Sequence, residues 1–128
     1  GHDGSLTTLH ANNPRDALAR METLVLMAGI ELPSQAIREQ IVSAVDFIVQ
    51  AARLADGSRK VTHVSAVIGM QGEVITLQNI YEFRQSGYDA AGKVVGRHIA
   101  TGEIPEFVQE MRKRGLEVDL TMFQDDKS

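Results

Sequence analysis

The stretch RKVTHVSAVIGMQGEVITLQNIYEFR, residues 59–84, decides the fold that the sequence predicts. It holds two runs rich in β-branched residues, which favour strands. A tight turn at Gln71 and Gly72 separates the two runs. Alternate side chains of the second run form two sets, which are Val74, Thr76, Gln78 and Ile80 on one face and Ile75, Leu77, Asn79 and Tyr81 on the other. We therefore predict a β-meander with strands over residues 59–70 and 74–84.

Two helices and a strand are predicted upstream of this meander. Apolar residues recur at helical spacing over residues 14–28, where Asn13 is the expected cap and Pro14 the first helical residue. A second helix is expected over residues 34–44. The following run fits a continued helix or a strand, and its β-branched density favours a strand over residues 46–54.

Downstream, the pattern predicts a turn at 55–58, a polar loop at 86–92 and a short strand at 93–100. A short helix is expected over 105–114, and the polar tail 124–128 is expected to fray.

Composition excludes several classes of function. The chain has 128 residues, a length typical of one domain, and a formal net charge of −4, which disfavours broad nucleic-acid binding. It has no cysteine, so no disulfide framework or thiolate metal site is expected. No run approaches the roughly 20 apolar residues of a membrane span. The absence of tryptophan and the 5% aromatic content argue against a base-stacking surface.

The segment GHDGSLTTLHANNP, residues 1–14, places His2 and His10 eight positions apart. We predict a strand over residues 5–11 that runs into the start of the first helix. A histidine there, beside a helix N-terminus, is well placed to meet a phosphate. Metal binding is disfavoured, because no third histidine or carboxylate cluster completes a site. The ordinary alternative is an exposed His2 and a buried, hydrogen-bonded His10.

A second stretch imitates a phosphate-binding motif. Residues 87–93, GYDAAGK, fit the G-x-x-x-x-G-K spacing, but Val94 stands where Ser or Thr would hold Mg²⁺. A strand is predicted after Lys93, whereas the motif requires a helix, so a plain hairpin turn is expected. The candidate phosphate contacts among the arginines are Arg15, Arg20, Arg38, Arg53 and Arg59.

Four blocks in order carry a family resemblance: GHDGSLTTLHANNPRDAL, METLVLMAG, LPSQAIREQI and DGSRKVTHVSAVIGMQGE. With GRHIATGEIPEF near the end, they resemble the secretion and pilus-assembly ATPases of type II and type IV secretion, most of all the CpaF type that serves tight-adherence (Flp) pili. The resemblance implies an α/β fold, the C-terminal part of a RecA-like ATPase domain, with a mixed sheet that includes a β-meander and flanking helices.

The resemblance also implies a function. Members of this family form hexameric rings that use ATP and Mg²⁺ to drive pilus assembly or secretion. They lie in the cytoplasm, peripheral on the bacterial inner membrane, where they work with platform proteins and not directly with nucleic acid. The first block matches the family's His box, which implies that His10, helped by Thr8, acts at the γ-phosphate and that His2 supports this loop. Thr7, Arg59 and Arg15 are the residues expected to contact the nucleotide or a neighbouring subunit.

The departures from the family are informative. Its phosphate loop, aspartate box and Walker B acids precede the His box and are not in this chain, so the isolated chain is expected to be inactive. Strand 5–10 would then lack its partners, which predicts an exposed edge. Ala66 stands where an acidic residue is expected. The alternative is a non-catalytic oligomerisation or docking module that uses the meander edge or the helix at 14–28.

Overall fold

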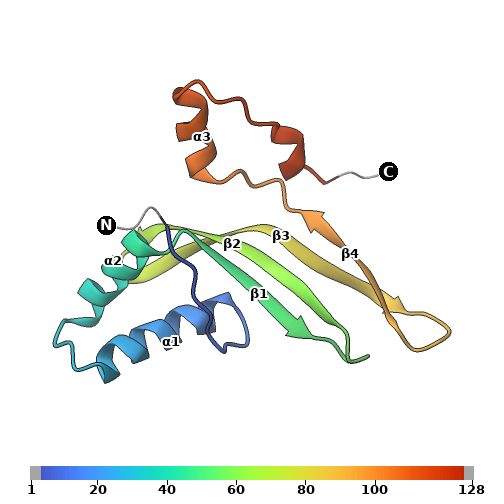
Figure 1. The fold of residues 1–128 in the computed structure, drawn as a ribbon, viewed down its shortest axis with the longest axis horizontal. Helices are drawn as coiled ribbons and strands as arrows, with labels where there is room; N and C mark the ends of the chain where they lie inside the picture. The colour runs from blue at the N-terminus through green and yellow to red at the C-terminus, as the bar shows by residue number, and fades with distance from the viewer. Residues whose placement is uncertain (1–3, 126–128) are drawn as a thin grey trace.

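The computed structural model describes residues 4–125. Figure 1 shows a twisted sheet with helices at two of its sides. In chain order the elements are α1 Pro14–Met27, α2 Ser34–Ala44, β1 Phe47–Arg53, β2 Arg59–Gln71, β3 Val74–Tyr88, β4 Val94–Ala100, α3 Glu106–Lys113 and the 3₁₀ helix η1 Leu120–Phe123. The predicted helices and strands from residue 14 onward are confirmed to within a few residues, except that β3 is longer and η1 was not predicted.

The four strands form one antiparallel sheet in the order β1-β2-β3-β4. The predicted β-meander is confirmed, but the expectation of a mixed sheet is wrong for the part of the chain that the structure describes. Each strand is joined to the next by a short turn, which permits only antiparallel pairing, because a parallel pair needs a long crossover.

Helix α1 begins and ends where the sequence predicts. The side chain of Asn13 accepts a hydrogen bond from the Asp16 amide at 2.8 Å, and Pro14 takes the first helical position. Gly29 follows the helix with φ +82°, a left-handed conformation that favours glycine. The N-terminus of α1 is therefore capped by the side chain of Asn13.

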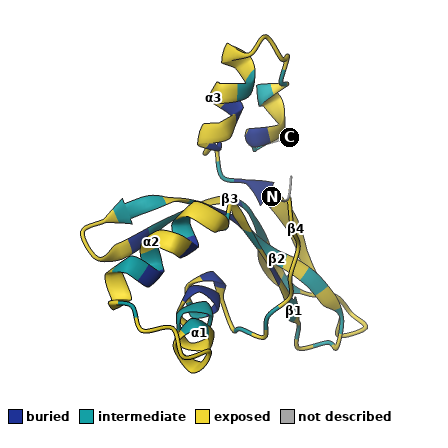
Figure 2. Cartoon of the chain, turned by 60° about the vertical axis from the view of Figure 1, so that its left-hand side comes forward, coloured by how far each residue is buried: buried dark blue, intermediate teal, exposed yellow. Residues whose placement is uncertain are grey.

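Two small cores lie on opposite faces of the sheet, which Figure 2 shows as separate buried patches. The first joins α1 and α2 to the sheet through Leu18, Ile37, Ile41 and Ile75. The second lies under the C-terminal segment and contains Ala66, Ile80, Val108 and Phe123. Val67 packs on the first core and its neighbour Ala66 belongs to the second, as expected for adjacent residues of a strand.

The predicted loop at 86–92 is shorter than expected, because β3 continues to Tyr88. The register with β4 shifts between Gln85 and Gly87, so Ser86 is an extra residue that a β-bulge absorbs. The connection is reduced to the turn at residues 89–93. Polar composition predicted a loop where the backbone remains paired through a bulge.

Asp56 ties the two hairpins together at their far end. Its carboxylate accepts hydrogen bonds from the Ser58 amide at 2.8 Å and hydroxyl at 2.5 Å, and from the Val94 amide at 2.8 Å. Val94 lies at the start of β4, so the β1–β2 turn is bound to the last strand. His98 Nε2 adds a second link by donating to the carbonyl oxygen of Val61 at 2.8 Å.

The predicted strand at 5–11 is wrong, since residues 4–11 have no regular secondary structure. The run alternates well enough for a strand, but a strand needs a neighbour to satisfy its backbone groups. No ladder in the described part of the chain includes these residues. Leu6 is fully exposed, which shows that its apolar side chain does not anchor the segment.

The C-terminal segment is held against β3 and β4. The Tyr81 hydroxyl donates to the carbonyl oxygen of Met122 at 2.6 Å, and Arg97 forms a two-bond ion pair with Asp125. The predicted fraying of the tail therefore does not extend to Asp125, and residues 126–128 lie outside the described range. No helix within residues 4–125 is long and apolar enough to cross a membrane.

Candidate functional site

A cavity of about 440 Å³ brings three of the predicted site residues together. It lies between the N-terminal segment, α1 and the outer edge strand β1. Thr7, Thr8 and His10 line one wall. The remaining walls are mostly apolar and consist of Leu9, Ala11, Ala17, Met21, Leu24, Val45, Phe47, Ile48, Val49, Gln50 and Ala51. This is the combination of apolar lining and few polar groups that is typical of ligand sites.

Three of the polar side chains that line this cavity remain available. Thr7, Thr8 and His10 are exposed, and within residues 4–125 their side chains make no hydrogen bond or ion pair. Hydroxyl and imidazole groups of this kind can donate to phosphate oxygens. The ordinary alternative of a hydrogen-bonded His10 therefore finds no partner in the described chain. His2, the other predicted histidine, lies outside the described residues.

The N-terminus of α1 is already occupied by a carboxylate. Asp16 accepts hydrogen bonds from the Asn12 amide at 2.9 Å and from Arg20 Nε at 3.1 Å. These bonds, the Asn12 amide first, lower the pKa of Asp16 below its usual value. Because Pro14 has no N–H, the first turn offers few free donors to a phosphate. The cavity is therefore the better place for a ligand than the helix terminus.

The structure does not place the predicted arginines at this cavity. Arg15 Nη1 donates to the carbonyl oxygen of Ile75 at 3.2 Å and lines a different cavity of about 250 Å³ with Arg38. Arg59 begins β2 and pairs in register with Arg53 at the turn end of the first hairpin. Their predicted nucleotide or subunit contacts would have to be made away from His10.

The phosphate-loop spacing at 87–93 is a closed hairpin turn, as predicted. Asp89 Oδ1 accepts from the amides of Ala91 and Lys93, each at 2.9 Å, and the Gly92 amide donates to the Asp89 carbonyl oxygen at 3.0 Å. The turn's own carboxylate occupies the amides that would cradle a phosphate.

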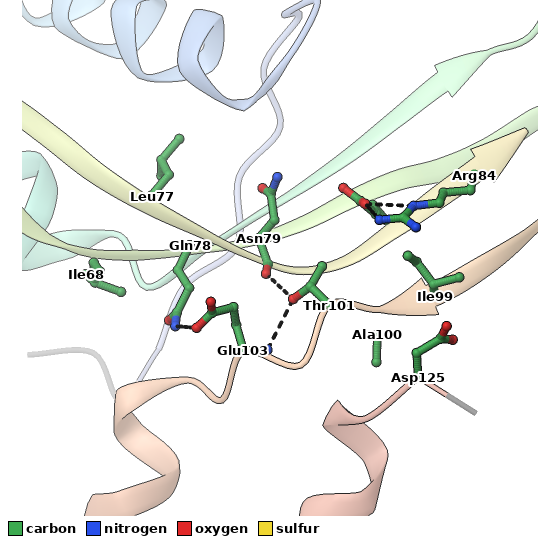
Figure 3. A pocket seen from close by; sticks show the side chains of 11 residues that line it. Ile68, Leu77, Gln78, Asn79, Arg84, Ile99, Ala100, Thr101, Glu103 and Asp125 are labelled. Carbon is green, nitrogen blue, oxygen red and sulfur yellow. Dashed lines mark hydrogen bonds and ion pairs between the residues drawn. The ribbon is translucent and has the colours of Figure 1, made fainter. Parts of the chain in front are cut away.

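A larger cavity, about 700 Å³, lies on the other side of the molecule between β3, β4 and the C-terminal segment. Figure 3 shows that several of its polar side chains are engaged with other residues that line it. Gln78 Nε2 donates to Glu103 at 2.7 Å, and Arg84 pairs with Glu82 at 3.0 Å. None of the predicted site residues lines it. This cavity is larger than the one beside β1, but its polar side chains stabilise the fold.

Sequence reasoning missed Gln50. This side chain is only 9% exposed, and its Nε2 donates to the carbonyl oxygen of Ala11 at 2.9 Å, beside His10. The signal was present, because Gln50 is the one polar residue in the run FIVQAA and a buried amide requires a partner. Within residues 4–125, no group of three or more His, Asp or Glu residues is arranged to hold a metal ion.

Comparison of the sequence with models of known protein families identifies the family of this chain. The family model described as "Type II/IV secretion system protein" matches residues 1–120. The chain belongs to the type II/IV secretion system protein family. This agrees with the resemblance drawn from the sequence blocks, while the CpaF type is not distinguished.

Curated relatives of this secretion-system family member are substantially longer. A Mycobacterium tuberculosis protein named "Putative conjugal transfer protein" is 32% identical over 71% of this chain and 25% of its own length. The conjugal transfer protein TrbB of Rhizobium radiobacter is 39% identical over 56% of this chain and 20% of its own. The type IV secretion system protein VirB11 of Bartonella quintana is 39% identical over 50% and 18%. The matched part of the chain thus covers a quarter or less of the length of each of these relatives.

Proposed function

We propose that this chain is the C-terminal part of a hexameric ATPase that powers secretion or pilus assembly at the bacterial inner membrane. The observation that carries the proposal is the family match over residues 1–120. Longer relatives, named for conjugal transfer and type IV secretion, leave room for the phosphate loop and the Mg²⁺ ligands elsewhere in the full protein. The finer assignment to the tight-adherence pilus type rests on the sequence blocks alone.

In this proposal, the cavity beside β1 forms one wall of the ATP site. His10 and Thr8 would hydrogen-bond the γ-phosphate, and Thr7 would contribute a further hydroxyl. Loss of that phosphate would then remove these contacts and release the short segment between His10 and the start of α1 at Pro14. ATP and Mg²⁺ would be held mainly by residues outside this chain, because electrostatic stabilisation of phosphoryl transfer needs the phosphate-loop lysine and the metal.

ATP turnover tests the proposal. We expect the 128-residue chain to hydrolyse ATP no faster than buffer, while a protein extended N-terminally through a G-x-x-x-x-G-K-[ST] motif hydrolyses it. In the extended protein, His10→Ala is expected to lower the rate. His98→Ala, at a histidine on β4 away from the cavity, is the control and should keep the rate although it loses the bond to Val61. Hydrolysis by the isolated chain, or an extended protein without activity, would contradict the proposal.

A second candidate function is a non-catalytic docking module, and one observation favours it. The C-terminal end of α1 and the loop after it expose four large apolar side chains, with Met27 77% exposed. The others are Leu24, Leu26 and Ile30. Contiguous exposed apolar residues mark interaction sites. The coding region upstream of residue 1 separates the two candidates, since a start codon immediately upstream supports the docking module and an in-frame phosphate-loop motif supports the ATPase.

A further inference from the structure

One buried amide joins the sheet to the segment that carries His10. Gln50 Nε2 donates to the carbonyl oxygen of Ala11 at 2.9 Å. Within residues 4–125, this is the only hydrogen bond between residues 4–11 and the rest of the chain. His10 directly precedes Ala11, so its placement depends on Gln50 on one side and on the capped start of α1 on the other.

A β-bulge lies opposite Gln50. Gln50 pairs with His63 and Ala51 pairs with Val61, which leaves Thr62 as an extra residue in β2. Thr62 Oγ1 donates to the carbonyl oxygen of Gln50 at 3.3 Å, and this bond fixes the backbone at the bulge. Bulges bend a strand and re-aim side chains, and they are frequent beside functional sites.

Burial makes this glutamine costly unless its amide is paired. Apart from Gln50, the only buried polar residue of the described chain is Ser65, which bonds to Asn79 within the sheet. The Gln50 amide bonds to a segment outside the sheet at 2.9 Å, and to the carbonyl oxygen of Ala51 in its own strand only at 3.4 Å. Leaving a buried polar group unpaired costs about 1–3 kcal/mol. An apolar residue at this position of the strand FIVQAA would not carry that cost. The amide is therefore explained by its bond to Ala11 and not by the packing of β1.

We propose that Gln50 is the positioning residue of His10, holding the segment at Ala11 so that the imidazole faces the cavity beside β1. The link between this position and ATP turnover rests on the proposed function, whereas the positioning itself does not. Gln50 acts through the main chain of Ala11 and is not assigned a contact with nucleotide.

Backbone relaxation measured by ¹⁵N NMR on the 128-residue chain tests the positioning. Gln50→Leu removes the donor, and Gln50→Glu keeps the size and polarity while its carboxylate can only accept. We expect order parameters at His10 and Ala11 to fall from about 0.85, the value of rigid backbone, to below about 0.6 in both variants. Gln40→Leu, an exposed glutamine on α2, is the matched control and should change nothing there. Unchanged order parameters in a folded Gln50 variant would overturn the proposal.

Kinetics on the N-terminally extended protein test the consequence for turnover. We expect Gln50→Leu to lower kcat by about 10- to 100-fold, the scale of misplacing a group at the reaction centre, with the KM for ATP unchanged. The double variant with His10→Ala should be no slower than His10→Ala alone, because both changes remove one function. Additive losses would overturn the proposal. Wild-type turnover in His10→Ala would instead contradict the proposed function, and the order parameters would still decide the role of Gln50.

Discussion

Two segments of this chain carry phosphate-binding signals, and they differ in whether their polar groups are already satisfied. The turn at 89–93 has the spacing of a phosphate loop, yet Asp89 accepts hydrogen bonds from its amides. The segment at 4–11 has no such spacing, yet it leaves Thr7, Thr8 and His10 exposed beside a cavity. A phosphate site needs unsatisfied donors, and motif spacing alone does not reveal whether the donors are free.

The turn and the segment also differ in how firmly each is attached to the rest of the fold. The turn belongs to a hairpin whose strands pair along their length with one bulge, whereas the segment at 4–11 is attached by a single side-chain hydrogen bond. Changes near the turn should therefore alter the free energy of unfolding, and changes in the segment should alter function only. Three predictions test this division.

The largest effect is expected for Gly96→Ala in β4. A Cβ at Gly96 would clash with the carbonyl oxygen of Arg84 and lie 2.6 Å from the Phe83 ring and 2.9 Å from the Gln85 Cα. Overpacking of this kind costs typically 1–3 kcal/mol, because backbone must move. Gly4→Ala is the matched control, since nothing lies within 4 Å of its added methyl group. Urea unfolding of both variants measures the difference, and equal stabilities would contradict the division.

A smaller loss is expected for Asp89→Ala. The change removes the acceptor of two turn amides, and we expect a loss of about 1 kcal/mol because water replaces those bonds at an exposed site. Asp46→Ala, also exposed, is the control with no side-chain hydrogen bond in the described chain. Thermal unfolding monitored by circular dichroism compares the two. A midpoint for Asp89→Ala equal to that of the control would show that the turn closes without its carboxylate.

The third effect depends on pH and involves Asp56. Hydrogen bonds from the Ser58 hydroxyl and then from the Val94 amide lower the pKa of this carboxyl to about 2. The unfolded pKa is near 3.9, so the folded state favours the charged form. Its contribution to stability is present above about pH 4 and is lost as pH falls towards 2.

Asp56→Asn removes this titration. We expect the difference in unfolding free energy between wild type and variant to shrink as pH falls from about 4 to about 2. The lowered pKa values of Asp16 and Asp119 are shared by both proteins and cancel in the difference. Urea unfolding at steps from pH 2 to 6 provides the measurement, and a difference that is constant over this range would contradict the role of Asp56.

Much of the fold was predictable because its signals are local. The cap at Asn13, the left-handed Gly29 and the alternation of β3 act within a few residues of the elements they define. The errors arose where pairing decides the outcome. The segment at 5–11 has strand composition but no partner, and Ser86 has loop composition but is absorbed by a bulge.

The candidate site was predictable only in part. The histidine and threonines were found because their types suit phosphate chemistry, whereas Gln50 and Asp56 act through long-range hydrogen bonds that one sequence does not display. Ala66 shows the reverse case. It is buried with Ile80 and Val108, so the acidic residue expected there would have an uncompensated charge in an apolar core.

The sequential order of the sheet has a kinetic consequence. Because β1 to β4 each pair with the next strand along the chain, the sheet can assemble by three successive hairpin closures over short loops. Such local topologies are associated with fast folding. The bond between Asp56 and Val94 spans 38 residues and requires both outer hairpins to exist first. We expect the bond between Asp56 and Val94 to be absent from the folding transition state, so that it slows unfolding and leaves the folding rate unchanged.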